Sequence, residues 1–261
     1  MTAAIIIPAR FGSTRFPGKP MQPVAGIPML KRVWLIAKSV ARCSRVIVAT
    51  EDTRIIDFAQ SFHAEAVLTS PQCRNGTERV FDALKQARIS EDIVINLQGD
   101  AVLTPPWILD SMITEMESNP GISVVTPALA LNGEALEAFS LHKVKNESSG
   151  TTVVFDRNRD ALYFSKRIVP YTRPPAVPSI YRHIGLYGYR RAALAQYCEL
   201  APSSLEQAEG LEQLRLLENG IPIRVIVVDY RGRAHASVDN LEDVQFAEAI
   251  IAREGELFVD R

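Results

Sequence analysis

The chain has 261 residues, enough to bury the core of one large α/β domain or two small ones without disulfide support. Lys and Arg number 29 against 30 Asp and Glu, so the formal net charge is −1 and no global basic field exists to hold the protein on DNA or RNA. Composition therefore argues against a nucleic-acid partner, and any bound phosphate must be held locally.

Cysteine usage and apolar runs give expectations about the compartment. Cys43, Cys73 and Cys198 are odd in number and lack a CxxC spacing, which argues against a disulfide framework or a zinc site. The N-terminal stretch MTAAIIIPAR lacks the basic start and long apolar core of a signal peptide, and no apolar run approaches the ~18 residues of a membrane span. We therefore expect a soluble, cytoplasmic protein with no membrane partner.

Apolar β-branched runs alternate with helical patterns along most of the chain. The runs AAIIIPA, RVIVAT, DIVINLQGD, ISVVTPA and IRVIVVD are typical of strands buried on both faces of a parallel-rich sheet. Helices are expected between most of them, at Pro28–Ala41, Thr53–Phe62, Gly76–Ala87, Pro105–Ser118 and Leu205–Asn219. This alternation predicts a three-layer α/β sandwich, in which ligands bind beyond the carboxyl ends of the strands.

The alternation breaks at about residues 146–190. There TTVVF, DRNRD and ALYFSK indicate a β-hairpin, followed by the loop RPPAVPS and one strand, HIGLYGYR. We interpret this segment as an antiparallel insertion in a single domain that spans residues 1–261. Its aromatic residues exceed what the main sheet needs, so we expect it to support a homodimer; they are Phe155, Tyr163, Phe164 and Tyr171.

A cationic loop follows the first predicted strand, in the stretch IIIPARFGSTRFPGKP. The P-loop pattern GxxxxGK[ST] does not fit, because five residues separate Gly12 from Gly18 and Pro20 replaces the hydroxyl residue. The two glycines still allow a tight turn that presents N–H groups, while Arg10 and Lys19 can neutralise a polyphosphate. The loop therefore predicts a nucleoside triphosphate site, although a solvated turn residue is an equally good interpretation of Arg15 taken alone.

Eight segments resemble one family in order and approximate spacing. They are PARFGSTRFPGKP, VIVATED, NGTERV, VINLQGD, ALYFS, RHIGLYGYR, LEQLR and VDNLEDV. The chain resembles the sugar-activating cytidylyltransferases, in particular the 3-deoxy-manno-octulosonate (Kdo) cytidylyltransferases, or CMP-Kdo synthetases. The resemblance implies a Rossmann-like nucleotide-diphospho-sugar transferase fold, a homodimer, and CTP and an ulosonic acid as substrates.

Two aspartates follow predicted strands and are candidates for a metal site. Asp100 ends DIVINLQGD, and Asp239 lies between a late strand and the last helix. Two carboxylates facing triphosphate oxygens suit Mg²⁺, and the resemblance matches this pair to the family's magnesium ligands. The alternatives are that Asp239 only helps to start the last helix and that Asp100 is an ordinary turn residue. Asn240 and Asp243 already provide a helix start, however.

A predicted helix start in CRNGTERVFDAL offers free N–H groups to a base or a ribose. A plain N-cap is the alternative, and Arg79 could equally form an ion pair with Glu78 or Asp82. The resemblance assigns Gly76, Thr77 and Arg79 to the nucleotide. The full expected nucleotide set is Pro8, Ala9, Arg10, Ser13, Arg15, Lys19, Asn75, Gly76, Thr77 and Arg79.

Recognition of an ulosonic acid needs a cation for its carboxylate and polar groups for its hydroxyls. The resemblance assigns this role to Gln98, Lys166, His183, Tyr187, Glu212 and Gln213. A lone histidine is more often structural, and a helical Glu-Gln pair usually faces solvent. The chain also departs from the family pattern: Ala101 replaces Glu, Lys166 replaces Arg, and the stretches NESSGT and AHASVD are unusual.

The expected reaction is nucleotidyl transfer from CTP to the anomeric hydroxyl of Kdo or a close relative, with release of pyrophosphate, for lipopolysaccharide or capsule synthesis. The catalytic set is Arg10, Lys19, Asp100 and Asp239, with Mg²⁺ as cofactor. Two alternatives stay open: a nucleotidyltransferase for another sugar acid or a sugar phosphate, and a CTP-binding paralogue without turnover.

Overall fold

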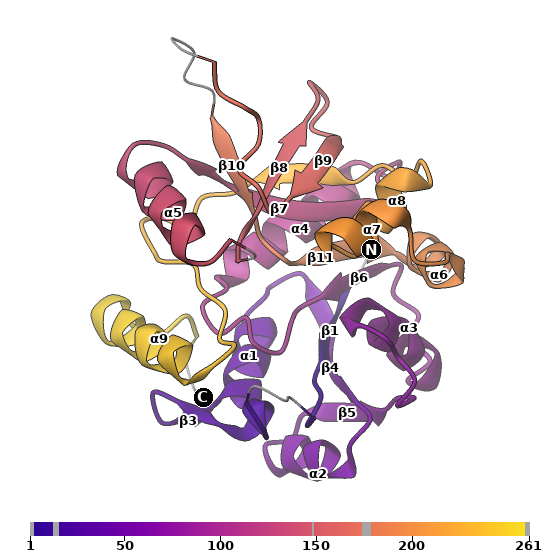
Figure 1. Cartoon of the computed structure of the whole chain (residues 1–261). Helices are drawn as coiled ribbons and strands as arrows, with labels where there is room; N and C mark the ends of the chain where they lie inside the picture. The colour runs from indigo at the N-terminus through magenta and orange to yellow at the C-terminus, as the bar shows by residue number, and fades with distance from the viewer. Residues whose placement is uncertain (1–2, 13–15, 148, 174–178, 259–261) are drawn as a thin grey trace.

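A mixed β-sheet forms the centre of the molecule in the computed structural model (Figure 1). The structure describes residues 3–12, 16–147, 149–173 and 179–258, and within these ranges the sheet has ten strands in the order β5-β4-β1-β6-β11-β7-β10-β8-β9, with β12 paired to β7. Ser13, Arg15 and most of the loop RPPAVPS lie outside the described residues. The strands are β1 Ala3–Pro8, β4 Cys43–Thr50, β5 Glu65–Leu68, β6 Ile93–Asn96, β7 Val124–Leu131, β8 Thr151–Phe155, β9 Ala161–Ser165, β10 Ile180–His183, β11 Tyr187–Arg190 and β12 Arg224–Val227.

Helices cover both faces of this sheet. One apolar core lies under α1, α2, α4 and α9, and a second lies under α3, α6 and α8. The three-layer α/β architecture predicted from the alternating pattern is therefore confirmed. The helices are α1 Met29–Lys38, α2 Thr53–Ser61, α3 Gly76–Gln86, α4 Pro106–Ser118, α5 Glu134–Lys145, α6 Arg191–Glu199, α7 Ser204–Glu209, α8 Leu214–Glu218 and α9 Leu241–Glu254; a 3₁₀ turn, η1 Lys19–Met21, and a small ribbon, β2 Pro23–Val24 with β3 Ile27–Pro28, precede α1.

Strand β1 shows why the central strands are continuous apolar runs. All six of its residues are buried. Ile5 and Ile7 belong to the first core, whereas Ala4 and Ile6 belong to the second. Side chains alternate between the faces of a strand, so a strand covered on both sides needs apolar residues at every position.

The predicted strand HIGLYGYR is two strands, which corrects the sequence-based expectation. Strand β10 pairs with the second half of β7 and with β8, whereas β11 pairs with the first half of β7 and with β6. The hydroxyl of Thr126 donates to the carbonyl of Leu186 at 2.8 Å, which holds the connecting turn over β7. This break is where the hairpin β8–β9 joins the sheet beside β10.

The predicted helix Leu205–Asn219 is also divided, into α7 and α8. Ser203 caps α7 in a capping box with Glu206, and the helix ends at Gly210 in the left-handed conformation, with φ 61°. Burial favours this division: Leu214 and Leu216 of α8 enter the second core, whereas α7 contributes no buried residue. The other four predicted helices match observed ones to within about three residues at each end.

One lysine side chain holds the unusual stretch NESSGT in place. The ammonium group of Lys143, at the end of α5, donates to the carbonyls of Glu147, Ser149 and Gly150 at 2.7 to 2.8 Å. Three carbonyl acceptors satisfy all the donors of an ammonium group. The stretch is therefore an ordered connection from α5 to β8 in its described part.

None of the described helices is long and apolar enough to cross a membrane. Cys43, Cys73 and Cys198 are free thiols.

Candidate active site

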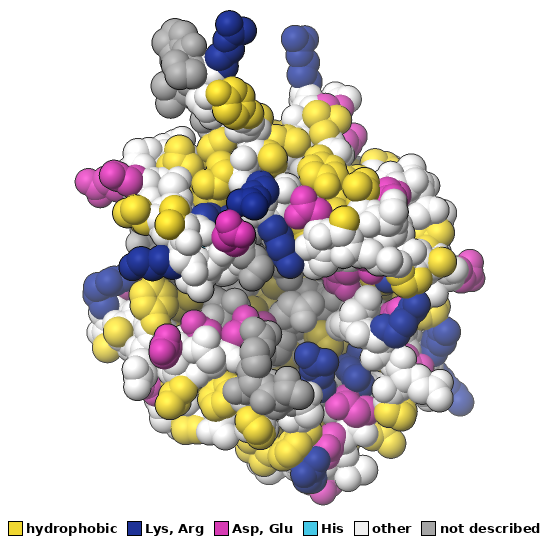
Figure 2. Space-filling view, viewed as in Figure 1, with side chains coloured by type: hydrophobic (Ala, Val, Ile, Leu, Met, Phe, Trp, Pro, Cys, Tyr) yellow, Lys and Arg dark blue, Asp and Glu magenta, His cyan; other side chains and the backbone are white. Residues whose placement is uncertain are grey.

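A cavity of about 520 Å³ opens at the carboxyl ends of β1 and β6. Figure 2 shows the molecular face hollowed between its upper and lower parts, with basic and acidic side chains around the hollow. The cavity is lined by Pro8, Ala9, Arg10, Gly12, Lys19, Pro20, Cys73, Arg74, Asn75, Gly76, Arg79, Gln98, Gly99, Asp100 and Asp239. Ten of these residues belong to the site predicted from sequence, as the strand-end rule for open α/β sheets leads one to expect.

Lys19 joins the two candidate carboxylates at one wall of this cavity. Its Nζ lies 2.8 Å from Asp100 Oδ2 and 3.1 Å from Asp239 Oδ1, although the two aspartates are far apart in the chain. Gly18, left-handed with φ 65°, turns the backbone into η1 and so presents Lys19 to the cavity. The ammonium group of Lys19 thus lies between two carboxylates, and a phosphate group entering the cavity could replace one of them as its partner.

Short backbone contacts hold the two aspartates at this position. Asp100 follows β6 in a tight turn, and its carbonyl accepts a hydrogen bond from the N–H of Val238 at 3.3 Å. Asp239 directly precedes Asn240, the N-cap of α9, and its own N–H donates to Asp243 Oδ2 at 2.8 Å. Asn240 and Asp243 form the capping box, so the carboxylate of Asp239 is not needed to start the helix.

Gly99 allows the turn after β6 to approach the loop after β1. A Cβ atom at this position would lie 2.9 Å from the carbonyl oxygen of Pro8. Since that oxygen belongs to the backbone, no side-chain rotation could relieve the contact. The position therefore requires glycine.

Arg10 is exposed at the cavity wall. Within the described residues it forms no ion pair, whereas Lys19 is engaged by two carboxylates. A fork of guanidinium donors without a carboxylate partner is suited to bind phosphate oxygens. Ser13 and Arg15, the other two predicted residues of this loop, lie outside the described residues.

The N-terminus of α3 forms the opposite wall. Asn75 caps the helix by accepting from the N–H of Glu78 at 2.9 Å, and Gly76 packs close to Pro8 and Gln98. The backbone N–H groups of this first turn provide donors for a ligand. Thr77 is fully buried and does not line the cavity, so any contribution from its side chain is indirect.

Arg79 lines the cavity but is also part of an ion pair. Its guanidinium contacts Glu51 Oε2 and donates to Thr69 Oγ1, both at 2.7 Å, whereas the sequence suggested Glu78 or Asp82 as partners. Glu51 follows β4 in the chain, so the pair connects α3 to the neighbouring strand. This pairing holds the α3 wall of the cavity in place.

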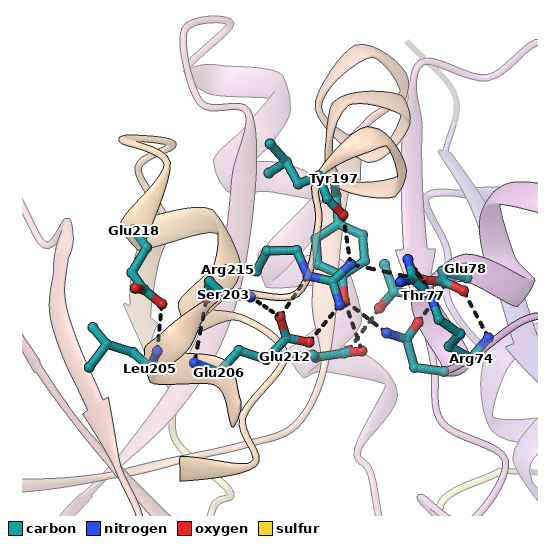
Figure 3. A network of polar contacts seen from close by, with 12 residues as sticks. Arg74, Thr77, Glu78, Tyr197, Ser203, Leu205, Glu206, Glu212, Arg215 and Glu218 are labelled. Carbon is teal, nitrogen blue, oxygen red and sulfur yellow. Dashed lines mark hydrogen bonds and ion pairs between the residues drawn. The ribbon is translucent and has the colours of Figure 1, made fainter. Parts of the chain in front are cut away.

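Glu212 lies behind this wall, in a polar network that connects α3 to α6 and α8 (Figure 3). Its Oε1 accepts from Thr77 Oγ1 at 2.8 Å, and Thr77 Oγ1 in turn accepts from Asn96 Nδ2 at 3.2 Å. Burial raises the pKa of Glu212, while the hydrogen bond from Thr77 and the charge of Arg215 oppose that rise. The resemblance assigned Glu212 to the sugar, but among the described residues its carboxylate accepts from Thr77 of α3 and from Tyr197 of α6.

Tyr197 is the second centre of this network. Its hydroxyl accepts from Asn75 Nδ2 at 2.9 Å and donates to Glu212 Oε2 at 3.5 Å, and its ring lies under the guanidinium of Arg215 at 4.5 Å. Arg215 is almost fully buried and pairs with Glu206 and Glu78. The amide of Asn75 is thereby fixed between Tyr197 on one side and the first turn of α3 on the other.

Most of the predicted sugar residues lie outside the cavity lining. Gln98 lines it, whereas Lys166, His183, Tyr187, Glu212 and Gln213 do not. His183 is buried, with Nε2 2.9 Å from Thr126 Oγ1, and burial lowers its pKa to about 3, so the ring is neutral at physiological pH. Gln213 is also buried, and its Nε2 has no hydrogen-bond partner among the described residues.

Ala101 is a buried core residue, 8% exposed, and belongs to the first apolar core. The sequence comparison suggested that a glutamate is missing from the sugar side at this position. The Ala101 side chain does not line the cavity.

Sequence reasoning missed several residues of the cavity wall, above all Arg74. Its side chain pairs with Glu78 and stands directly before the N-cap of α3. That position, one residue before a helix start already predicted to bind the nucleotide, was the available signal. Gly12 was noted for its backbone but was not included in the site, and Gly99, Pro20 and Cys73 were not singled out for it from the sequence.

Comparison with known proteins identifies the family. A family model described as cytidylyltransferase matches residues 4–225. The chain is 51% identical to the 3-deoxy-manno-octulosonate cytidylyltransferase of Maricaulis maris, covering 98% of this chain and 100% of that protein. The chain belongs to the 3-deoxy-manno-octulosonate cytidylyltransferase family.

Further relatives agree with this assignment. The 3-deoxy-manno-octulosonate cytidylyltransferase of Chlamydia felis is 40% identical over 93% of this chain and 91% of that protein. A solved CMP:2-keto-3-deoxy-manno-octonic acid synthetase in complex with CTP superposes with a TM-score of 0.87 at 37% identity, covering 97% of this chain and 100% of that one. The resemblance inferred from eight short segments is thus confirmed, and the chain is a nucleotidyltransferase.

The Tyr197–Asn75 contact gives a prediction for this cytidylyltransferase. Tyr197→Phe removes only the hydroxyl and keeps the ring under Arg215. A lost hydrogen bond is worth about 1 kcal/mol, so affinity for CTP should fall about fivefold while the fold is preserved. Calorimetric titration with CTP measures this.

Tyr181→Phe is the matched control. Tyr181 stacks on Phe155, with 4.6 Å between ring centroids, and its hydroxyl has no hydrogen bond among the described residues. This variant should bind CTP like the wild type. Equal CTP affinity in both variants would show that the Tyr197 hydroxyl does not position the N-terminus of α3 for CTP.

Proposed function

We propose that the protein transfers CMP from CTP to Kdo or a close ulosonic-acid relative, giving the CMP-sugar and pyrophosphate. The observation that carries the proposal is the cavity in which Lys19, Asp100 and Asp239 face the N-terminal turn of α3 across one space. Family membership supports the same activity, because the relatives are named for it. Lipopolysaccharide or capsule synthesis is the proposed use of the product, and the cytoplasm is its proposed site.

Positioning and charge neutralisation account for most of the proposed catalysis. Arg10 and Lys19 hold the triphosphate, and the first turn of α3 holds the nucleoside. The anomeric hydroxyl of the sugar then attacks the α-phosphorus in line, its proton is lost to solvent, and pyrophosphate departs with the electrons of the broken P–O bond. No covalent enzyme intermediate is required.

The two aspartates fit a magnesium ion. Asp100 Oδ2 and Asp239 Oδ1 converge on Lys19 Nζ at 2.8 and 3.1 Å, so both oxygens face the same point of the cavity. Mg²⁺ takes one or two carboxylates and completes its coordination with phosphate and water. When bound, the ion would offset the charge of the triphosphate, while Lys19 would exchange a carboxylate partner for a phosphate oxygen.

Lys166 is the proposed cation for the sugar carboxylate. Its backbone N–H donates to Glu209 Oε2 at 2.8 Å, while its ammonium group forms no ion pair within the described residues. A Cβ placed on Gly210 would lie 3.1 Å from Lys166 Nζ, so the side chain extends across the turn between α7 and α8. The ammonium group is therefore available to a carboxylate, as a point charge without the fork of an arginine.

Lys166→Met tests this assignment with a panel of substrates. We expect KM for Kdo to rise about tenfold or more, since one charge-assisted contact is lost, while KM for CTP is unchanged. Lys145→Met, an exposed lysine of α5, is the control. Pyrophosphate release is measured with Kdo, an amino-substituted Kdo, a sialic acid and a sugar phosphate. Turnover of the sugar phosphate and of none of the acids would contradict the proposed substrate class.

The homodimer is proposed on the basis of apolar side chains exposed beside the hairpin β8–β9. Of the four aromatic residues expected at an interface, Phe164 is fully buried in the second core, whereas Tyr171 is 87% exposed. Leu162, on β9, is 64% exposed. Exposed apolar residues on one face favour association with a second copy.

Light scattering at micromolar concentration should therefore report a dimer. Leu162→Glu should shift the mass toward the monomer, because it places a charge in the proposed interface. Leu141→Glu, at a 62% exposed position on α5, should not change the mass. A monomeric wild type would exclude this interface.

A further inference from the structure

Three polar side chains without polar partners among the described residues lie close together outside the catalytic cavity. Arg182 is half-buried, and its guanidinium forms no hydrogen bond or ion pair with any described residue but lies over the ring of Phe139, 5.4 Å from its centroid. Tyr230 is 2% exposed, and its hydroxyl has no hydrogen-bond partner in the described part of the chain. Nδ1 of His235 is likewise buried and unpartnered.

Sheet register places these residues on one face. Arg182 pairs with Leu129 of β7, and the N–H of Val228 donates to the carbonyl of the adjacent Ala128. Side chains two residues apart point to the same face of a strand, and both Val228 and Tyr230 belong to the first core. Arg182 thus lies on the face covered by this core and by α5, opposite to the face reached by His183.

The segment after β12 brings the imidazole into the same group. The rings of Tyr230 and His235 meet edge to face, with 5.5 Å between their centroids. The charge of Arg182 acts on both: burial raises the pKa of Tyr230 and lowers that of His235 to about 3, and in each case the field of Arg182 adds a lowering effect. The imidazole is therefore neutral, and its single proton can reside on Nδ1.

Arg182 has no acidic partner in the described part of the chain. Burial lowers the pKa of Arg182, and only the phenol of Tyr230 opposes that effect. The neighbouring cation, Lys143, is already saturated by three carbonyls and feels the charges of Lys166, Arg167 and Arg182. A buried charge without a partner and buried polar atoms without hydrogen bonds are each costly, so native proteins normally supply a partner.

We propose that Arg182, Tyr230 and His235 form a binding site for a small oxyanion or carboxylate. The guanidinium supplies a charged fork, the phenol supplies an O–H donor, and the neutral imidazole supplies an N–H donor. None of the three lines the catalytic cavity, so this site is separate from the triphosphate site. An anion there pairs with the half-buried guanidinium and gives both buried, unpartnered atoms a hydrogen-bond acceptor.

Occupancy of this site has a consequence for the catalytic centre. Tyr230 and His235 lie in the segment that leads to Asp239, and the N–H of Val238 in that segment bonds the carbonyl of Asp100. An anion that fixes both rings to β10 therefore restrains the backbone that carries Asp239. The full chain should be more resistant to unfolding when the anion is present.

Thermal unfolding of the full chain in sulfate, and separately in acetate, tests the site. The buffer contains saturating CTP and a chelator, so that the triphosphate occupies the catalytic cavity. The wild type should gain a few degrees in Tm with either anion, and the two arms distinguish an inorganic oxyanion from a carboxylate. Tyr230→Phe keeps the packing and removes one donor, so its apparent dissociation constant for the anion should be about tenfold weaker.

Tyr230→Glu provides the decisive comparison, because it supplies an internal carboxylate to Arg182. This variant should have a higher Tm than the wild type in anion-free buffer and should no longer respond to sulfate or acetate. Arg182→Met should also lose the response. An anion response that is equal in the wild type, Tyr230→Phe and Tyr230→Glu, or no response in the wild type, would overturn the proposal.

Discussion

Replacing either Asp100 or Asp239 with asparagine is expected to lower kcat/KM by about a hundredfold or more, because each change removes one charge from the group that faces the triphosphate. Both carboxylates contact Lys19, so each variant also weakens the placement of that cation. The side chains lie at the edge of the cavity, 28% and 46% exposed, and no core volume is lost. Steady-state pyrophosphate release measures the effect.

The fold should survive both changes, and circular dichroism should match the wild type. Asp243→Asn is an informative control, since this side chain does not line the cavity and asparagine keeps an oxygen that can accept from the N–H of Asp239. It should cost some stability and little activity. Near-wild-type turnover of Asp100→Asn or Asp239→Asn at limiting Mg²⁺ would refute the assignment of the pair.

A second large effect is expected for Gly99→Ala. The added methyl group would lie 2.9 Å from the carbonyl oxygen of Pro8, so the turn after β6 and the loop after β1 must separate. Overpacking of this kind costs about 1 to 3 kcal/mol of unfolding free energy. Because Asp100 is the next residue, its carboxylate moves as well, and a displacement near 1 Å can cost about a hundredfold in rate.

Gly121→Ala is the matched control for this prediction. Gly121 also lies in a turn, but nothing surrounds the position that its Cβ would occupy within 4 Å. Urea unfolding and pyrophosphate release are measured for both variants. If Gly99→Ala kept the stability and activity of Gly121→Ala, the close approach would have no role in the site.

The central strands and the helix starts could be predicted from sequence because their signals are local. A strand buried on both faces must be apolar throughout, as β1 is. Asn75 and Asn240 cap α3 and α9 by accepting a hydrogen bond from the N–H group three residues later in the chain. The strand-end rule then placed Lys19, Asp100 and Asp239 on one edge, although Lys19 and Asp239 are 220 residues apart.

Other features depend on tertiary contacts that no local pattern reveals. The segment HIGLYGYR breaks into two strands because β11 lies between β6 and β7, whereas β10 lies on the other side of β7, next to β8. Thr126 holds the turn between β10 and β11. Glu212 is expected to face solvent from its helical sequence, but it bonds Thr77, 135 residues away. Arg79 pairs with Glu51 of the neighbouring strand end instead of a residue on its own helix.

The most direct test of the proposed function is an end-point measurement with purified full chain, CTP and Kdo, with and without Mg²⁺. We expect pyrophosphate and CMP-Kdo to form in equal amounts, quantified by phosphate assay and mass spectrometry, only when CTP, Kdo and Mg²⁺ are all present. Pyrophosphate released from CTP without sugar, or no CMP-Kdo in the complete mixture, would contradict the account.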